Sequence, residues 1–109
     1  MSLSELKRAI SAKMPVSFTY DKPGKTPGQR IGNPHVIFIM RKNDGIESTK
    51  VHIVQTDGVS DSGQDFPSFR MFNLEDLGEV MMIESGGKFD ISDKYNAESD
   101  MYKFVICKI

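Results

Sequence analysis

Arg70 is the residue whose type and position point most directly to chemistry, because it interrupts a largely apolar run at residues 68–74. Side chains of a strand alternate between faces, so we expect Arg70 to share a face with Phe72 and Leu74. A guanidinium keeps its proton inside a protein, and burying it without a partner is very unfavourable. Arg70 is therefore expected to pair with a carboxylate of Glu75, Asp76 or another acid, to reach water with its charged head, or to bind an anionic ligand.

Two further side chains suit the same chemistry. Arg30 lies near the end of a loop predicted at residues 21–32, where it is either a plain surface arginine or a ligand contact. Tyr20 ends a strand-like segment at residues 16–20. A tyrosine in such a place either packs its ring and uses its hydroxyl locally, or stacks on a base or bonds a phosphate. Both alternatives stay open for each residue.

The sequence carries no pattern typical of catalysis or of metal binding. It has no complete Gly-x-x-x-x-Gly-Lys-Ser/Thr phosphate loop, since Thr19 stands where the first glycine before Gly24-Lys25-Thr26 would be, and it has no Gly-x-Ser-x-Gly elbow and no His-Glu-x-x-His motif. His35, His52 and Cys107 do not have the spacing of a zinc site, which normally takes four ligands. Cys107 is the single cysteine and is expected to be a small buried hydrophobe. We therefore predict no enzyme, no metal and no cofactor.

Length and composition indicate one ordinary globular domain over residues 1–109. The chain has 109 residues, of which 39% are hydrophobic and 27% charged, too apolar a balance for a disordered protein. It contains no long apolar run and no basic-then-apolar leader, which leads us to expect a cytoplasmic protein with no membrane partner.

Charge is spread unevenly along the chain although the formal net charge is only −1. Residues 1–54 hold nine Lys or Arg against four Asp or Glu, whereas residues 55–109 hold five against eleven. The unevenness is either a solvated surface of uneven composition or a basic patch that attracts an anionic ligand. A protein that binds duplex DNA without sequence preference normally has a strong basic excess, so we do not expect this chain to bind duplex DNA by itself.

The pattern of apolar residues predicts a mainly β protein that opens with one helix. Ser2-Leu3-Ser4-Glu5 resembles a capping box, Leu6 and Ile10 are expected to face the core, and Met14-Pro15 ends the helix. Strands are predicted at residues 16–20, 36–40, 50–56, 68–74, 79–84 and 101–109, with loops at 21–32 and 57–64. Five or six short strands favour a small barrel or a strongly bent sheet, and closure would remove exposed edges.

The order of these elements resembles the WYL domain family. The residues that carry the resemblance are Ala9-Ile10 in the helix, Tyr20 at a strand end, Arg30-x-x-x-Pro34 after the loop, Arg70-x-Phe72-x-Leu74 with Glu75-Asp76-Leu77, and an aromatic at Phe89 or Tyr95. The match spans about residues 6–95. The segment in the place of the Trp-Tyr-Leu triplet reads Val51-His52-Ile53, and Asp76 stands where the family has a basic residue.

The resemblance implies a small Sm-like β-barrel of five or six strands and a role in ligand sensing. Such domains bind nucleotides, oligonucleotides or other anionic signals and serve in transcription regulation, commonly beside a DNA-binding helix module. Carried over by position, the ligand-binding residues would be Arg70, Arg30 and Tyr20, together with His52 from the replaced triplet.

Three functions follow from the sequence. The first is a non-enzymatic sensor that binds a small anionic ligand or oligonucleotide. The second is a protein–protein adaptor, or a homo-oligomer, in which the arginines are structural. The third is a weak binder of single-stranded nucleic acid, which would lose affinity steeply with salt.

Overall fold

The computed structural model of the chain describes residues 2–60 and 65–109 and shows one helix and six strands. The elements are α1 (Ser2–Ala12), β1 (Val16–Tyr20), β2 (Gln29–Arg41), β3 (Glu47–Gly58), β4 (Ser68–Asn73), the short 3-10 helix η1 (Leu74–Asp76), β5 (Leu77–Met82) and β6 (Phe104–Lys108). The predicted fold class, mainly β with one N-terminal helix, is confirmed at this level. Part of the loop predicted at 57–64 lies outside the described residues.

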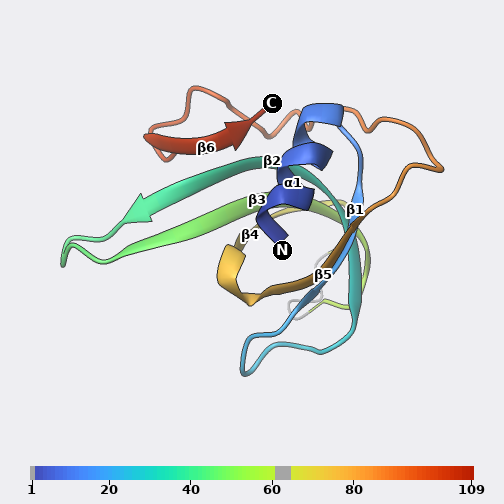
Figure 1. Ribbon diagram of the computed structural model, residues 1–109, viewed down its shortest axis with the longest axis horizontal. Coiled ribbons are helices and arrows are strands. Elements are labelled where there is room, and N and C mark those ends of the chain that lie inside the picture. Colours follow the sequence, from blue (N-terminus) through green and yellow to red (C-terminus); the bar gives the residue numbers. More distant parts are fainter. Residues whose placement is uncertain (1, 61–64) are drawn as a thin grey trace.

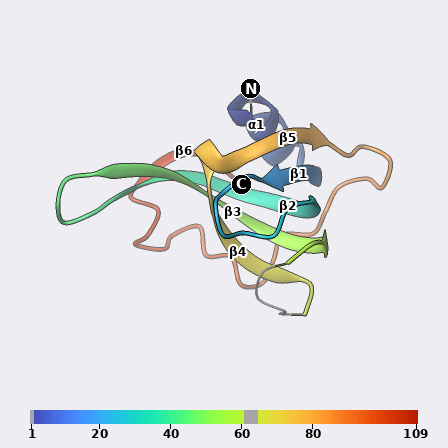
Figure 2. The same ribbon diagram turned by 90° about the horizontal axis from the view of Figure 1, so that it is seen from below.

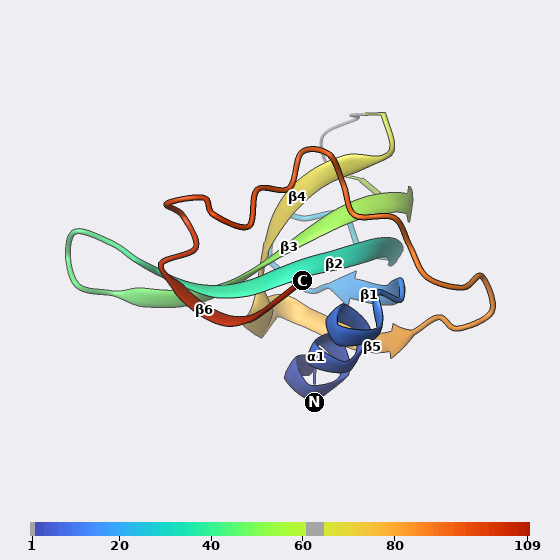
Figure 3. The ribbon, with the colours of Figure 1, turned by 90° about the horizontal axis from the view of Figure 1, so that it is seen from above.

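The six strands form one antiparallel sheet in the order β4-β3-β2-β1-β5, with β6 paired to β2 off this path. The two end strands of the path, β4 and β5, are consecutive in the chain and are joined by the three residues of η1. A link this short forces the sheet to curl until its ends approach each other. Figures 2 and 3 show this curl, with η1 passing from β4 to β5. Among the described residues β4 and β5 do not pair, so the sheet is strongly bent but not closed into a barrel.

Irregularities in strand pairing help the sheet to bend. The register between β2 and β3 shifts between Ile31 and Gly32 and again between Pro34 and Val36. The pairing of β1 with β5 shifts between Ser17 and Thr19. Bulges of this kind bend a strand and increase its twist. They let β2 pair with β1 along its first part and with β6 along its second part.

The concave side of the sheet holds the hydrophobic core, and α1 covers it. Leu6, Ala9 and Ile10 of the helix are at most 1% exposed, as their spacing predicts. The cluster that they join contains residues from every strand except β6. Its buried members are Leu6, Ala9, Ile10, Val16, Phe18, Tyr20, Ile37, Val51, Ile53, Phe72 and Leu77. The view in Figure 1 places α1 against the sheet near β1 and β2.

The convex side of the sheet is covered by the segment 83–103, which contains turns but no helix or strand. Figure 3 shows this segment running across β3 and β4 before it enters β6. Its rings pack on two buried histidines of the sheet, with Phe89 stacked 5.1 Å from His35 and Tyr102 5.4 Å from His52. The sheet therefore has two covered faces, one under α1 and one under this segment.

Several predicted element boundaries are wrong. The loop predicted at 21–32 ends earlier, because the backbone of residues 29–32 pairs with β1 and β3 despite its glycine and polar side chains. The strand predicted at 79–84 begins already at Leu77, directly after η1. The last strand is shorter than the predicted 101–109, and Phe104, Val105 and Ile106 in it are exposed.

Candidate anion-binding site

Two arginines meet at one amide oxygen on the concave side of the sheet. Arg30 of β2 and Arg70 of β4 each donate a hydrogen bond to Gln55 Oε1 of β3, at 3.4 and 3.3 Å. Both distances are longer than the usual 2.9–3.0 Å of an N–H···O bond. Two permanent positive charges therefore lie side by side at the end of β3.

Further contacts of Arg70 orient its guanidinium toward one end of the concave face. Its Nε donates to Ser68 Oγ at 2.6 Å, and a terminal nitrogen donates to Ser60 Oγ at 2.9 Å. The guanidinium carbon lies 5.5 Å from the ring centre of Phe66. Arg70 itself is half-buried. A planar cation held by hydroxyls and a ring, with part of its surface in water, has the setting of a group that can accept an anion.

Arg30 lies deeper than Arg70 and is only 1% exposed. It donates to the backbone carbonyl of Thr26 at 3.4 Å. Its guanidinium carbon lies 5.8 Å from the ring centre of Tyr20 and 5.7 Å from that of Phe72. Arg30 is therefore enclosed by the sheet, whereas part of the Arg70 side chain reaches the surface.

Strand pairing and one glycine fix the position of Arg30. In the pairing register Arg30 stands opposite Phe18 on one side and Gly58 on the other. Gly58 has a φ of +96°, and a Cβ there would lie 2.3 Å from the Gln29 carbonyl oxygen and 2.7 Å from Arg30 Cα. Glycine is therefore required for β2 and β3 to approach this closely beside the arginine.

Gln55 is fully buried, and its other contacts fix which way its amide points. Its Nε2 donates to the carbonyls of Asp57 at 3.1 Å and Val59 at 2.7 Å. The amide oxygen must then face the two arginines, because turning the amide over would bring N–H donors against N–H donors. Gln55 was not predicted from the sequence. Its only signal is a polar residue at the end of an apolar strand.

The acids that follow β4 have contacts of their own at the end of that strand. Asp76 Oδ2 accepts a hydrogen bond from Asn73 Nδ2 at 3.2 Å, and Lys50 Nζ donates to Asn73 Oδ1. Burial lowers the pKa of Lys50, helped by the charges of Lys22 and Lys42, while Glu75 and Asp76 act in the opposite direction. Lys50, Asn73 and Asp76 thus form a polar network of their own.

Tyr20 joins the site through its ring rather than through its hydroxyl. It is 6% exposed, and its ring centre lies 4.9 Å from that of Phe72. Its hydroxyl accepts a hydrogen bond from the backbone N–H of Asn73 at 3.1 Å. The residue therefore forms part of the wall beside Arg30, and its hydroxyl is engaged with the backbone of β4.

His52 lies on the other face of the sheet from Arg30, Arg70 and Tyr20. Its ring centre is 4.8 Å from Phe69 and 5.0 Å from Phe38, and its Nδ1 is 2.5 Å from the Tyr102 hydroxyl. Burial, and to a lesser degree the charge of His35, lowers the pKa of His52 to about 4. Three of the four residues predicted to bind a ligand are thus brought together, and the fourth is not.

His35 lies beside His52 under the segment 83–103 and is fully buried. Its Nδ1 is 2.8 Å from the Asn33 carbonyl, and its Nε2 accepts the backbone N–H of Ser92 at 3.0 Å. Burial lowers the pKa of His35 although the Asn33 carbonyl raises it. Burial also raises the pKa of Tyr102 to about 12, so its hydroxyl keeps its proton and can donate it to His52. These contacts hold the segment against the sheet.

No three His, Cys, Asp or Glu side chains among residues 2–60 and 65–109 come together in a way that would hold a metal ion. Within the same part of the chain, no helix has the length and apolar character needed to cross a membrane.

No known protein family, no curated protein and no solved structure matches the chain.

Proposed function

We propose that the protein is a non-enzymatic β-sheet module that binds an anionic ligand, such as a nucleotide or a short oligonucleotide, at the Arg30–Gln55–Arg70 cluster. The observation that carries this proposal is the meeting of two guanidinium groups at one amide oxygen. A ligand phosphate at Arg70 would gain charge-assisted, bidentate hydrogen bonds there and the additional field of the buried Arg30. The basic character of residues 1–54 supports the same assignment.

We also propose that the bent sheet is an open form of the Sm-like barrel that the WYL resemblance implies. The short link between the two end strands, through η1, supports this proposal. In this arrangement the ligand would lie at the end of the concave face where Arg70 is half-buried. Its binding would signal to a partner in a regulatory role, with transcription regulation as the expected setting.

Thermal unfolding in the presence of anions tests the proposal. The panel contains inorganic phosphate, mono-, di- and cyclic nucleotides, and short single-stranded RNA and DNA. A ligand at 100 times its Kd adds about 2.7 kcal/mol of stability, which in a domain of this size raises Tm by on the order of 10 °C. We expect such a shift for at least one phosphate compound, and the oligonucleotide arms at low and high salt separate the single-strand binder from the sensor.

Arg70→Gln is the decisive variant, because its half-exposed side chain can be shortened and neutralised without emptying the core. It should remove the ligand-induced shift while the protein stays folded. Arg8→Gln is the matched control, since Arg8 is a surface arginine paired with Glu5 at 2.7 Å. No shift with any anion, or a shift that survives Arg70→Gln, would show that the proposal is wrong.

A protein–protein adaptor is the second candidate, and one observation favours it. Phe104, Val105 and Ile106 in β6 are 45%, 36% and 37% exposed, which leaves three consecutive apolar side chains on an edge of the sheet. Edge strands of this kind pair readily with another chain. In that case Arg30 and Arg70 are structural, and Arg70→Gln lowers stability without altering any response to anions.

A further inference from the structure

The segment 83–103 on the convex side is attached at its start to the link between α1 and β1. The backbone N–H of Ile83 donates to the Pro15 carbonyl at 2.7 Å, and that of Phe89 donates to the Lys13 carbonyl at 2.8 Å. Both bonds join backbone to backbone, so they do not depend on the ionisation of a side chain.

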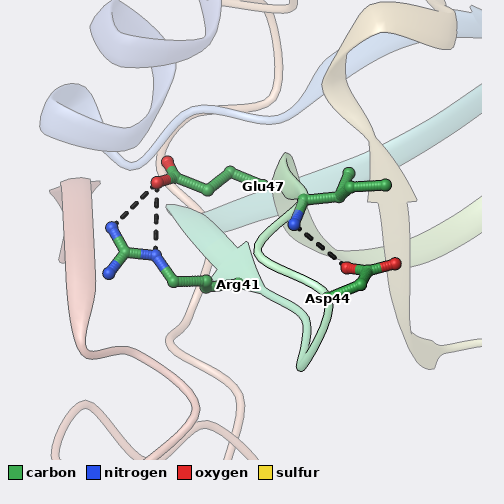
Figure 4. Close-up of polar contacts among 4 residues, drawn as sticks. Arg41, Asp44 and Glu47 are labelled. Carbon is green, nitrogen blue, oxygen red and sulfur yellow. Dashed lines mark hydrogen bonds and ion pairs between the residues drawn. The ribbon is translucent and has the colours of Figure 1, made fainter.

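The segment is attached at its end as well, because it continues into β6, which pairs with β2. Phe104, the first residue of β6, places its ring centre 4.8 Å from the guanidinium carbon of Arg41. Figure 4 shows that Arg41 is held in turn by one oxygen of Glu47, with hydrogen bonds of 3.2 Å from Nε and 2.8 Å from a terminal nitrogen, beside the turn in which Asp44 Oδ1 accepts the Ile46 N–H at 3.0 Å. Residues 90–102 therefore form a strap between two attached ends.

The strap packs loosely on the sheet. None of residues 90–102 is fully buried. Two of its contacts with β6 are weak, since Lys108 Nζ donates to the Ala97 carbonyl at an exposed position, at 3.1 Å, and the Tyr95 hydroxyl lies 3.4 Å from the Ile109 carbonyl. Segments with few buried contacts are the ones that open at the lowest free energy.

Two further hydrogen bonds of the strap end on histidine ring nitrogens of the sheet. His35 Nε2 accepts the backbone N–H of Ser92 at 3.0 Å, and the Tyr102 hydroxyl donates to His52 Nδ1 at 2.5 Å. His35 Nδ1 faces the Asn33 carbonyl at 2.8 Å and must carry the proton of the ring, so Nε2 has the lone pair that Ser92 requires. A second proton on His35 would set N–H against N–H and remove this bond.

The surroundings of both rings offer no counterion for such a proton. The side chains packed on them are aromatic and come from β2, β4 and the segment: Phe38, Phe69, Phe89, Tyr95 and Tyr102. Among the residues that the structure describes, neither ring forms an ion pair with a carboxylate.

The ionisable groups near the two rings are few. They are each other and the hydroxyls of Tyr95 and Tyr102, and burial raises the pKa of Tyr95, with a further rise from Glu98 of the strap and Cys107 of β6. The charged neighbours of Ser92 in the chain, at positions 90, 93 and 94, are exposed. Burial lowers the pKa of both histidines, and the charge of His35 lowers that of His52 further.

We propose that the strap is an acid-operated cover of the sheet. A proton on His35 breaks its bond to Ser92, and a proton on His52 places a charge in an apolar site without a counterion. Residues 90–102 then leave the convex face, while both attached ends and the rest of the sheet stay folded. The opening uncovers an aromatic surface that includes Phe69. This surface lies on the other side of the sheet from the arginine cluster, and the proposal does not depend on the function proposed there.

Amide hydrogen exchange in the wild-type protein tests for local opening. The protection of the Ser92 N–H, the ratio of its intrinsic to its observed exchange rate, is measured at pH 7 and pH 5 beside that of the slowest amides of β3. A histidine with a pKa of about 4 in the closed form, as for His52, and the ordinary value in the open form lowers protection about twentyfold over this range. We expect at least this loss at Ser92, and protection at least about tenfold below that of β3 at both pH values. Equal protection at Ser92 and in β3, which means global unfolding only, or unchanged protection at Ser92 would overturn the proposal.

The ring nitrogen signals of the histidines test the geometry without any substitution. At pH 7 His35 should carry its proton on Nδ1 and have an unprotonated Nε2. As the pH falls, the ring should take up its second proton in step with the loss of protection at Ser92. A proton on Nε2 at pH 7, or a ring that becomes protonated while Ser92 keeps its protection, would refute the proposed role of His35.

Tyr102→Phe tests the second histidine bond, because it removes the hydroxyl beside His52 and keeps the half-buried ring. It should lower the protection of Ser92 at pH 7 about fivefold, as for the loss of one hydrogen bond. Tyr95→Phe is the matched control on the same strap, and its long 3.4 Å contact with the Ile109 carbonyl predicts a change of less than about twofold. Equal changes in the two variants would contradict the proposal.

Discussion

The hydroxyl of Tyr20 accepts a hydrogen bond from the backbone N–H of Asn73 at 3.1 Å, and the two residues belong to strands that are not neighbours in the sheet. Tyr20 ends β1 and Asn73 ends β4, so the bond spans the side of the bent sheet where strand pairing is missing. A second contact reinforces it, because the backbone N–H of Asp21 donates to the Asp76 carbonyl at 2.8 Å. The Tyr20 hydroxyl therefore joins β1 to β4, and the Asp21 bond holds η1 beside the end of β1.

Tyr20→Phe tests how much this side-chain contact contributes. The variant keeps the ring beside Phe72 but leaves the half-buried Asn73 N–H without its acceptor, so we expect a loss of about 1–2 kcal/mol in the free energy of unfolding. Urea unfolding measures it. Tyr95→Phe is the control, since its hydroxyl makes only a 3.4 Å contact with the Ile109 carbonyl. Equal losses in the two variants would contradict the role given to Tyr20.

Gln55→Glu places a carboxylate between Arg30 and Arg70 without changing the size of the side chain. The new internal anion should occupy both guanidinium groups, so we expect anion binding to weaken at least about tenfold in a protein that remains folded. Its second oxygen faces the Asp57 and Val59 carbonyls where Gln55 donates, so we expect the variant to be less stable than the wild type. The measurement is the ligand-induced shift in Tm. Gln29→Glu adds the same charge at an exposed position of β2 and should leave the shift in place. An unchanged shift in Gln55→Glu would argue against this cluster as the ligand site.

The histidines under the segment 83–103 predict a loss of stability in acid. The pKa of His52 is lowered from 6.5 to about 4, mainly by burial, so the unfolded chain takes up a proton at a pH where the native protein does not. Stability from this residue is present above pH 6.5 and is lost as the pH falls toward about 4, by on the order of 2 kcal/mol. His35, with a lowered pKa, acts in the same direction.

Urea unfolding between pH 7.5 and pH 4.5 measures this effect. His52→Asn keeps an acceptor for the Tyr102 hydroxyl but cannot take up the proton, so its stability should fall less steeply over this range. The carboxylates are the same in both proteins and cancel in the comparison. Parallel curves for the wild type and His52→Asn would contradict the prediction.

Gly58 and Gly45 form a matched pair that separates crowding from backbone strain. Both have positive φ values, +96° and +84°, but a Cβ at Gly58 meets the backbone at 2.3 Å while one at Gly45 meets nothing within 4 Å. Gly45→Ala should cost about 1 kcal/mol from the left-handed conformation. Gly58→Ala should cost about 3 kcal/mol and should also shift the amide signal of Arg30. Similar losses in stability would show that the close approach beside Arg30 is not rigid.

The elements of this fold could be predicted from sequence because each follows a local pattern. The helical spacing of Leu6 and Ile10 and the alternation at residues 16–20 were sufficient for α1 and β1. Residues 29–32 were assigned to a loop because their strand pairing depends on contacts with β1 and β3, which are distant in sequence. The extent of sheet closure likewise depends on the distance between the unpaired end strands β4 and β5, and no local sequence pattern predicts that distance.

The residues of the candidate site also differ in whether the sequence alone could reveal them. Arg70 was found because an arginine in an apolar strand is unusual by itself, and the resemblance added Arg30 and Tyr20. Gln55 carries no such signal, because its importance arises only when β2, β3 and β4 lie side by side. His52 was grouped with the arginines by its position in the sequence, yet alternation along β3 directs it to the opposite face from Gln55.

The connection of the two end strands through η1 also has a consequence for the order of folding. The strands β2 and β3 pair and are close in sequence, so the chain can bring them together at little loss of entropy, and η1 keeps β4 and β5 near each other although they do not pair. The β1–β5 ladder joins Val16 to Met82, which requires a much larger loop to close. We therefore expect β1 and β5 to pair late, and the concave face to take shape only when most of the chain is already in place.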